Sequence, residues 1–138
     1  MQFGIGQPNP RTEDPRLVRG LGRYADDVNL IGQLYGVAVR SPHAHAALGA
    51  IDASLALDAP GVVMVLTAAD LGAAGIGPMP SRVTLKNSDG SEMPDIPHPV
   101  LPADCVRHVG EPVAFVIAET AEAARDAAEL VEVDYDPL

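Results

Sequence analysis

Short apolar runs divide the chain into segments of β-strand length. The clearest runs lie at 34–40, 62–66 and 112–118, with glycine or proline at or beside their ends. A weaker run covers 46–51, and residues 131–135 alternate apolar with acidic positions, as a half-buried strand does. These runs predict a domain built around β-sheet.

Residues that cap helices precede several short segments between these runs. Asp14 is placed to cap a single turn, which Pro15 favours at its first position and Gly20 ends. Asp52, Thr67 and Thr120 are placed to cap the three further helices that we predict at 53–57, 68–71 and 121–130.

The last predicted helix joins two strands into a strand–helix–strand unit over 112–135. Its apolar stripe is thin and rich in alanine, so the helix should lie close to the sheet; the stripe consists of Ala121, Ala124, Ala128 and Val131. If the two strands are parallel, the crossover should be right-handed. Within 112–118 we expect Val116 to be buried, and Phe115 and Ile117 to point to the opposite face.

Two long segments lack these patterns. Residues 1–15 hold three prolines and two glycines, which predicts an extended arm. Residues 72–103 hold six of the 13 prolines, and we predict a long loop there with a short strand at 82–86 inside it. Regular structure resumes at 105–107.

Composition and charge limit the class of protein. A length of 138 residues suits one domain, and 47% hydrophobic residues suffice for a packed core. The net charge of −10 argues against a nucleic-acid binder and against an anchor on anionic lipid. With no Trp and only five Phe and Tyr, the core must consist of aliphatic residues and alanine. We therefore predict a single α+β domain over residues 1–138.

The cysteine content and the N-terminal sequence indicate the cellular compartment of the protein. Cys105 is the only cysteine, so the chain has no internal disulfide and no thiolate cluster for zinc or iron–sulfur. The N-terminus lacks the basic and apolar regions of a signal peptide, and no run approaches the roughly 20 apolar residues of a membrane span. We expect a cytoplasmic protein.

Histidine and cysteine offer two candidate constellations. His43 and His45 would share one face of an extended segment and could hold a metal together with a carboxylate. A catalytic zinc needs three protein ligands, and the sequence pattern indicates no third one. The favoured interpretation is therefore that the two histidines form ordinary hydrogen bonds. Cys105 beside His108 could form a thiolate–imidazole pair, but no oxyanion site accompanies them. A cysteine packed in a strand is the favoured interpretation there.

The remaining motifs do not define a site. Gly4-Ile5-Gly6 resembles half of a dinucleotide fingerprint, but Asn9 stands where the third glycine should be and no strand precedes it. The chain contains neither a Gly-Lys-Ser/Thr phosphate loop nor a Gly-x-Ser-x-Gly elbow. From the residues alone we assign no catalytic, cofactor-binding or metal-binding residue.

Acidic residues crowd the C-terminal unit, where Arg125 is the only base. A solvated face is the ordinary explanation, and a docking surface for a basic partner is the alternative. The residues are Glu119, Glu122, Asp126, Glu129, Glu132, Asp134 and Asp136.

Five ordered blocks cover nearly the whole chain and carry a family resemblance. They span 16–28, 32–46, 60–71, 106–120 and 129–138. In this order they resemble the start of the large molybdenum-binding subunit of the xanthine dehydrogenase/aldehyde oxidase superfamily. The opening Gly4-Ile-Gly-Gln-Pro8 and the later Gly110-Glu-Pro112 look most like the carbon monoxide dehydrogenase-type branch.

The resemblance implies an α/β-hammerhead domain, with a mixed sheet, short helices and the C-terminal strand–helix–strand unit. It also implies an N-terminal piece of a larger oxidoreductase subunit that hydroxylates aldehydes, N-heterocycles or carbon monoxide with oxygen from water. Later domains of such subunits bind molybdenum through molybdopterin, usually as the cytosine dinucleotide. Partner subunits carry 2Fe-2S clusters and FAD. The catalytic glutamate and cofactor segments lie beyond residue 138, so the implied role is scaffolding and docking, inactive in isolation.

Some alternatives stay open. The polar residues Arg23, Asp26, Asp27 and Arg40 inside the blocks either cap turns and form surface ion pairs, or bridge to downstream domains. The chain as a whole could instead be a stand-alone acidic interaction module. A third possibility is a small hydrolase that uses His43, His45 and a carboxylate on a metal.

Overall fold

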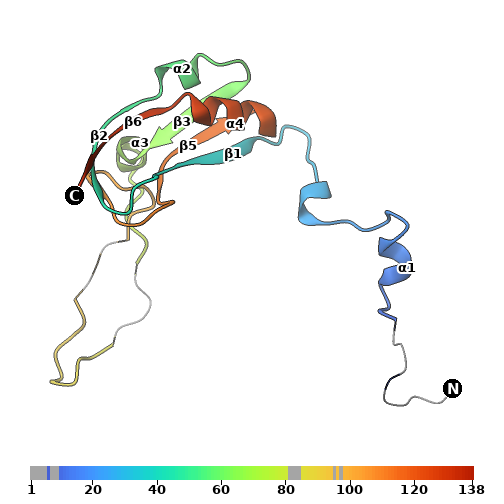
Figure 1. Ribbon diagram of the computed structural model, residues 1–138, viewed down its shortest axis with the longest axis horizontal. Helices are drawn as coiled ribbons and strands as arrows, with labels where there is room; N and C mark the ends of the chain where they lie inside the picture. Colours follow the sequence, from blue (N-terminus) through green and yellow to red (C-terminus); the bar gives the residue numbers. More distant parts are fainter. Residues whose placement is uncertain (1–5, 7–9, 81–84, 95, 97) are drawn as a thin grey trace. The chain divides into compact units, whose positions relative to one another are not determined.

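The computed structural model describes residues 6, 10–80, 85–94, 96 and 98–138 (Figure 1). Contacts divide the chain into two units, Met1–Gln33 and Leu34–Leu138. The prediction of one domain over the whole chain stays a prediction. Within the described residues, no helix has the length and apolar character that crossing a bilayer requires.

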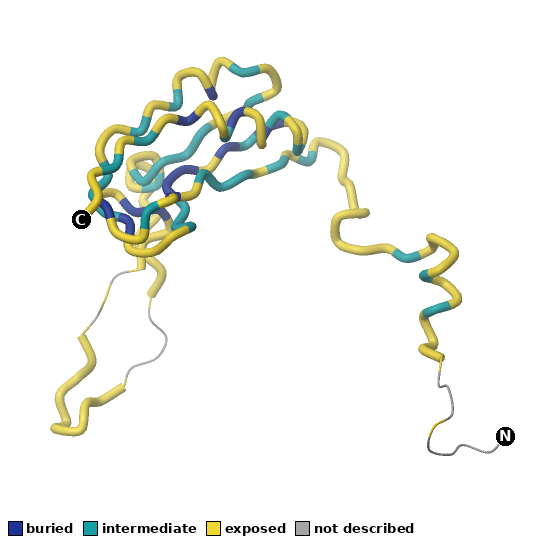
Figure 2. The backbone as a smooth tube through the Cα atoms, viewed as in Figure 1, coloured by how far each residue is buried: buried dark blue, intermediate teal, exposed yellow. Residues whose placement is uncertain are grey.

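The first unit contains the short helix α1 (Asp14–Leu17) and the 3-10 turn η1 (Ala25–Asp27). No residue of either element is buried (Figure 2). The predicted extended arm at 1–15 lies mostly outside the described residues, and its last two residues belong to α1.

Both ends of α1 follow from its sequence, with one difference from prediction. Pro15 lies in the first turn, as expected, but Glu13 takes the N-cap position and Asp14 is the first helical residue. Proline has no N–H to be capped, so the turn can start without a side-chain cap. Gly20 follows the helix at a φ of +69°, where glycine avoids the strain of a Cβ.

The second unit holds two three-stranded sheets. Sheet A has the order β1–β5–β3, formed by Tyr35–Arg40, Pro112–Ala118 and Val62–Thr67. Sheet B has the order β4–β2–β6, formed by Cys105–Val106, Ala46–Asp52 and Glu132–Pro137. The helices of this unit are α2 (Ser54–Leu57), α3 (Ala68–Ala73) and α4 (Ala121–Glu129).

Strand pairing differs from the expected mixed sheet. Among the described residues every strand pair is antiparallel, and β5 and β6 lie in different sheets. The predicted order strand–helix–strand over 112–135 is present, but its strands do not pair, so no parallel crossover exists. The reason is that β1 and β3 occupy both edges of β5, which leaves β6 to pair with β2.

Side-chain caps fix the starts of the helices in this unit. Thr120 Oγ1 accepts the Ala123 N–H at 3.1 Å, as predicted for α4. Asp52 Oδ1 accepts the Ser54 N–H at 2.9 Å, but Ala53 and not Asp52 takes the N-cap position, and α2 starts one residue later than expected. Each cap satisfies a backbone donor that the helix itself leaves free.

The core is small and aliphatic, as the composition predicts. Helix α4 buries Ala124 and Ala127 completely, and Ala127 was missing from the predicted stripe. One cluster joins α4 and α2 to one face of sheet A around Val116; it consists of Ala56, Ala114, Val116, Ala127 and Val131. A second cluster, Ala46, Val106 and Val113, joins the two sheets.

The predicted long loop contains more pairing than its proline content suggested. Isolated bridges join Met79 to His98 and Lys86 to Glu92, and the Asn87 N–H donates to the Ser91 carbonyl at 2.8 Å. The described parts of 79–98 thus belong to a looped arm with isolated bridges between its two sides, which we call the 79–98 arm (Figure 1). Most of the strand predicted at 82–86 lies outside the described residues.

Candidate docking surface

Sheet A presents two different faces. Its inner face packs on α4 and α2 through residues such as Val116 and Val65. The register places a second set of side chains on the opposite side, because Phe115 pairs with Ala38 and Leu66, and Ile117 pairs with Gly36 and Met64. We call this set the outer face of sheet A: Gly36, Ala38, Met64, Leu66, Phe115 and Ile117.

The outer face is apolar and open. Phe115 is 37% exposed and Met64 is 41% exposed, whereas Val116 on the inner face is 0% exposed. The Phe115 ring lies across Gly36: a Cβ on this glycine would overlap the ring atom Cε1. The absence of a side chain at position 36 therefore lets the ring lie flat against the sheet.

A groove continues the outer face toward α3. It encloses about 410 Å³ between Phe115 and Leu66 on the sheet, Leu71 on α3 and the segment at Val100–Leu101. Arg40 lines its rim, and its Nη1 donates to the Gly110 carbonyl at 2.8 Å. The groove can hold an apolar side chain and offers little to a charged one.

The Gly-Glu-Pro block forms a corner that fixes the start of β5. The Ser41 N–H donates to the Glu111 carbonyl at 2.9 Å, and the Gly110 N–H donates to the Ser41 carbonyl at 2.8 Å. Gly110 has a φ of +84°, which favours glycine. The largely buried Glu111 carboxylate accepts the Arg107 N–H. This block is therefore a structural turn in the described chain.

The two histidines that were candidate metal ligands have different surroundings. His43 packs on Tyr135, with ring centroids 4.9 Å apart, while His45 is exposed. They do not lie on one strand, because Pro42 follows β1 and the chain bends before β2. Burial raises the pKa of the Tyr135 hydroxyl above its ordinary value, and a hydrogen bond with Ser41 partly offsets this.

Cys105 and His108 do not form a nucleophilic pair. The Cys105 thiol lies 3.3 Å from the Val106 carbonyl, and His108 Nδ1 lies 3.6 Å from a carboxylate oxygen of Glu111. Cys105 is half-buried in β4, in agreement with the interpretation as a packed strand residue.

Charged residues that the sequence singled out take local or solvated positions. Asp27 accepts the Tyr24 N–H at 2.8 Å, which caps η1, and Arg40 binds the Gly110 carbonyl. Arg23 and Asp26 are exposed. The seven carboxylates of the C-terminal unit are also exposed, in agreement with a solvated face.

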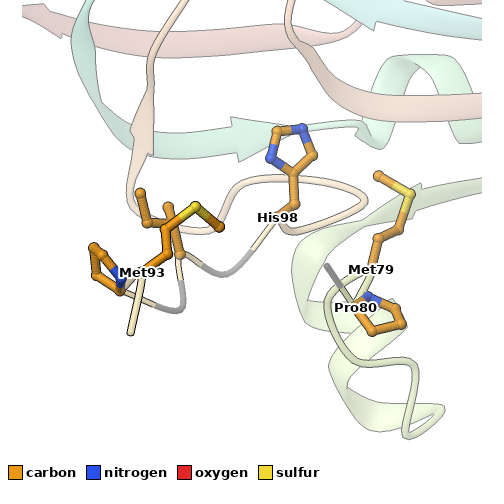
Figure 3. A pocket seen from close by; sticks show the side chains of 6 residues that line it. Met79, Pro80, Met93 and His98 are labelled. Atoms are coloured by element: carbon orange, nitrogen blue, oxygen red, sulfur yellow. The ribbon is translucent and has the colours of Figure 1, made fainter. Parts of the chain in front are cut away.

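The 79–98 arm carries a separate hollow (Figure 3). Its lining is apolar apart from one imidazole and consists of Met79, Pro80, Met93, Pro94, Ile96 and His98. The backbone hydrogen bond from Met79 to the His98 carbonyl, 2.8 Å long, holds its two sides together. Among the described residues that line the hollow, His98 is the one titratable group.

The described residues show no cluster of metal ligands. Within them, no three His, Cys, Asp or Glu side chains gather closely enough to hold a metal ion. No chemical step is therefore assigned to residues of this chain. The strongest surface feature is the outer face of sheet A with its groove, which is suited to binding another apolar surface.

Comparison with known proteins assigns this two-sheet α+β fold to a family. Residues 19–138 match the family described as aldehyde oxidase and xanthine dehydrogenase, a/b hammerhead domain. The chain belongs to this family. The resemblance and the hammerhead fold inferred from the sequence are thereby confirmed.

Several relatives are similar over almost the whole chain. The chain is 43% identical over 134 residues to the nicotine 6-hydroxylase large subunit of Paenarthrobacter nicotinovorans, covering 97% of this chain and 16% of that protein. It is 44% identical over 135 residues to the carbon monoxide dehydrogenase large chain of Afipia carboxidovorans, covering 98% and 15%. The crystal structure of a Cu,Mo-CO dehydrogenase matches with a TM-score of 0.75 and 45% identity, covering 98% and 16%. The chain thus spans about a sixth of the length of these relatives.

Proposed function

We propose that the chain is the N-terminal scaffold and docking domain of a molybdenum hydroxylase large subunit. Family membership and the names of the relatives support the class of enzyme. The observation that carries the docking role is the apolar outer face of sheet A, which no described element of the second unit covers fully. The domain holds its shape through its own core and offers this face to the rest of the enzyme.

The cofactors of such an enzyme would belong to other parts of the assembly. We infer that the later part of the subunit binds molybdenum as molybdopterin cytosine dinucleotide, and that partner subunits carry 2Fe-2S clusters and FAD, in the cytoplasm. The substrate is left open, because one relative is named for nicotine and another for carbon monoxide. Specificity would reside in the later domains.

A stand-alone acidic interaction module is the second candidate. Residues 34–138 carry 15 Asp and Glu against five Lys and Arg, so the full net charge of −10 lies on the second unit. This charge would favour a basic partner. The small metal hydrolase has no comparable support, since no group of three metal ligands that includes His43 or His45 is found among the described residues.

Expression of the complete reading frame together with its neighbouring genes tests the proposal. We expect a frame that continues well past codon 138, a product that contains molybdenum, and reduction of a dye with one of carbon monoxide, an aldehyde or an N-heterocycle. A frame that stops near codon 138, or a longer product without molybdenum, would contradict the proposal. The first outcome would favour the acidic module.

A further inference from the structure

We propose that the outer face of sheet A is covered, in the whole protein, by an apolar surface of the polypeptide that follows Leu138. This inference rests on the proposed function, because it requires a longer subunit. It adds which face of the domain is covered and which part of the polypeptide covers it.

The composition of the strands is the first argument. Strands of an antiparallel sheet with one solvent-exposed face alternate apolar and polar residues, whereas strands buried on both faces are apolar throughout. Strands β3 and β5 contain no charged residue, and the only hydroxyl is Thr67, at the end of β3. By contrast β6 alternates acidic residues with Val133 and Tyr135. The composition of sheet A therefore suits burial of both of its faces, and α4 and α2 bury only the inner face.

The shape of the outer face supports a packed contact. Phe115 lies flat over Gly36, which gives a smooth surface beside Met64 and Ile117. The groove beside Leu71 and Leu101 provides one deeper place where an apolar side chain of the occupant can insert. A flat apolar area with a single deeper pocket is the kind of surface that a hot-spot contact needs.

Charge argues against a second copy of the chain as the occupant. The second unit carries the whole net charge of −10, so stacking two such units would bring two strongly acidic bodies together. The six positions of the outer face carry no charge that could offset this repulsion.

The length of the relatives and the exit of the chain favour the downstream polypeptide. About five sixths of each relative lies outside the region matched here. The Leu138 N–H donates to the His45 carbonyl at 3.0 Å, just before β2, and the Leu48 N–H of β2 donates to the Asp104 carbonyl at 2.9 Å. Asp104 lies three residues after Leu101, which lines the groove. Leu138 is therefore bonded to the segment that leads into β2, and β2 is bonded to the segment that follows the groove.

Methionine oxidation in the full-length protein tests whether the face is covered. Met64 on the outer face and Met93 on the 79–98 arm are matched in exposure, at 41% and 40%. Peroxide oxidation of each would be followed by mass spectrometry, in the native protein and in guanidinium. We expect native Met64 to oxidise at least about 20-fold more slowly than in guanidinium, since a covered thioether is shielded from the reagent. A rate within about threefold of the unfolded one would overturn the proposal. The oxidation rate of Met93 in the native protein shows how freely peroxide reaches a side chain of equal exposure outside the outer face of sheet A.

Photocrosslinking identifies the occupant. The full-length protein carrying Phe115→p-benzoylphenylalanine retains an aromatic side chain at the centre of the face. After irradiation, the linked peptide should lie C-terminal to Leu138 in the same polypeptide. A linked peptide from a second copy, or from a different protein, would overturn the choice of occupant.

These outcomes separate the inference from the proposed function. Molybdenum content is measured on the same preparation, so a molybdenum-containing protein with freely oxidised Met64 would refute the inference and leave the function standing. A longer protein that lacks molybdenum but links position 115 to its own later segment would refute the function and leave the inference standing.

Discussion

Asp70 fixes the start of α3 through a single carboxylate. Its Oδ2 accepts the Thr67 hydroxyl at 2.6 Å and the Thr67 N–H at 2.7 Å. These bonds stabilise the charged form, the hydroxyl bond most and the backbone bond second, and they lower the pKa of Asp70 below its ordinary value. A carboxyl with a lowered pKa stabilises the folded state above the unfolded pKa, and that contribution is lost as the pH falls through the folded pKa.

Removal of the hydroxyl should change this pKa. In Thr67→Val we expect the pKa of Asp70 to rise toward its ordinary value, because only the backbone donor remains, and α3 should fray at a higher pH than in the parent chain. An NMR titration of the Asp70 side-chain carboxyl measures the effect. Thr67→Ser is the matched control and should keep the lowered pKa. Equal values in the valine and serine variants would contradict the role given to the hydroxyl.

Gly36 and Phe115 should be energetically coupled. Gly36→Ala places a Cβ against the Phe115 ring, so we expect it to destabilise the chain by about 1 kcal/mol as the ring moves off the sheet. In a Phe115→Ala background the same change should be neutral or stabilising by up to about 1 kcal/mol, since alanine suits a strand better than glycine.

Urea unfolding of the double-mutant cycle measures this coupling. Gly72→Ala is the control, because a Cβ there would have no neighbour within 4 Å, and its effect should be the same in both backgrounds. An equal cost of Gly36→Ala with and without the ring would show that Phe115 does not lie on Gly36.

At the scale of elements, sheet A and the 79–98 arm should differ strongly in protection. Strand β5 is paired on both edges, whereas the described arm is held by bridges near its base and near its tip. We expect amides of the arm such as Asn87 to exchange on the order of 1000-fold faster than Val116, because local opening of the arm exposes few buried contacts. Hydrogen exchange read by NMR measures both sites. Similar rates would show that the arm is part of the core.

The sequence predicted the elements well, because their signals are local. Apolar runs and capping residues located β1, β3, β5 and α4 to within about two residues, in line with the usual uncertainty of element ends. The prediction that Phe115 and Ile117 oppose Val116 is confirmed by the exposure of Phe115 and the burial of Val116. Such alternation within one strand can be read from the sequence alone.

Sheet pairing and most of the candidate surface were not predictable in this way. The separation of β5 and β6 into two sheets depends on competition between distant strands for the edges of β5. Met64 and Leu66 join Phe115 only through the register of β3, which includes an irregularity between Val62 and Met64. A bulge of this kind changes which residues face outward, and no turn or motif in the sequence marks it.

At the scale of the whole molecule, the 138-residue chain should carry no redox chemistry of its own. We expect the purified chain to contain no molybdenum, iron or flavin, and to reduce no dye with carbon monoxide, aldehydes or purines. The reason is that the sequence holds a single cysteine and no complete cofactor motif, and that within the described residues no three metal-ligating side chains gather. Elemental analysis and an absorption spectrum give the answer, and stoichiometric metal in the protein as isolated would contradict the assignment.

Within the second unit, α4 and α2 cover the inner face of sheet A, and the outer face is left open for a partner surface. Val116 is 0% exposed on the inner face and Phe115 is 37% exposed on the outer face. Denaturant unfolding of Val116→Ala and Phe115→Ala in the 138-residue chain measures how far each face is buried. Val116→Ala should cost about 1–3 kcal/mol, and Phe115→Ala at most about 2 kcal/mol despite the larger side chain removed. A cost for Phe115→Ala of about 3–5 kcal/mol, the value for a buried phenylalanine, would show that the outer face is already filled within the chain and would contradict the account.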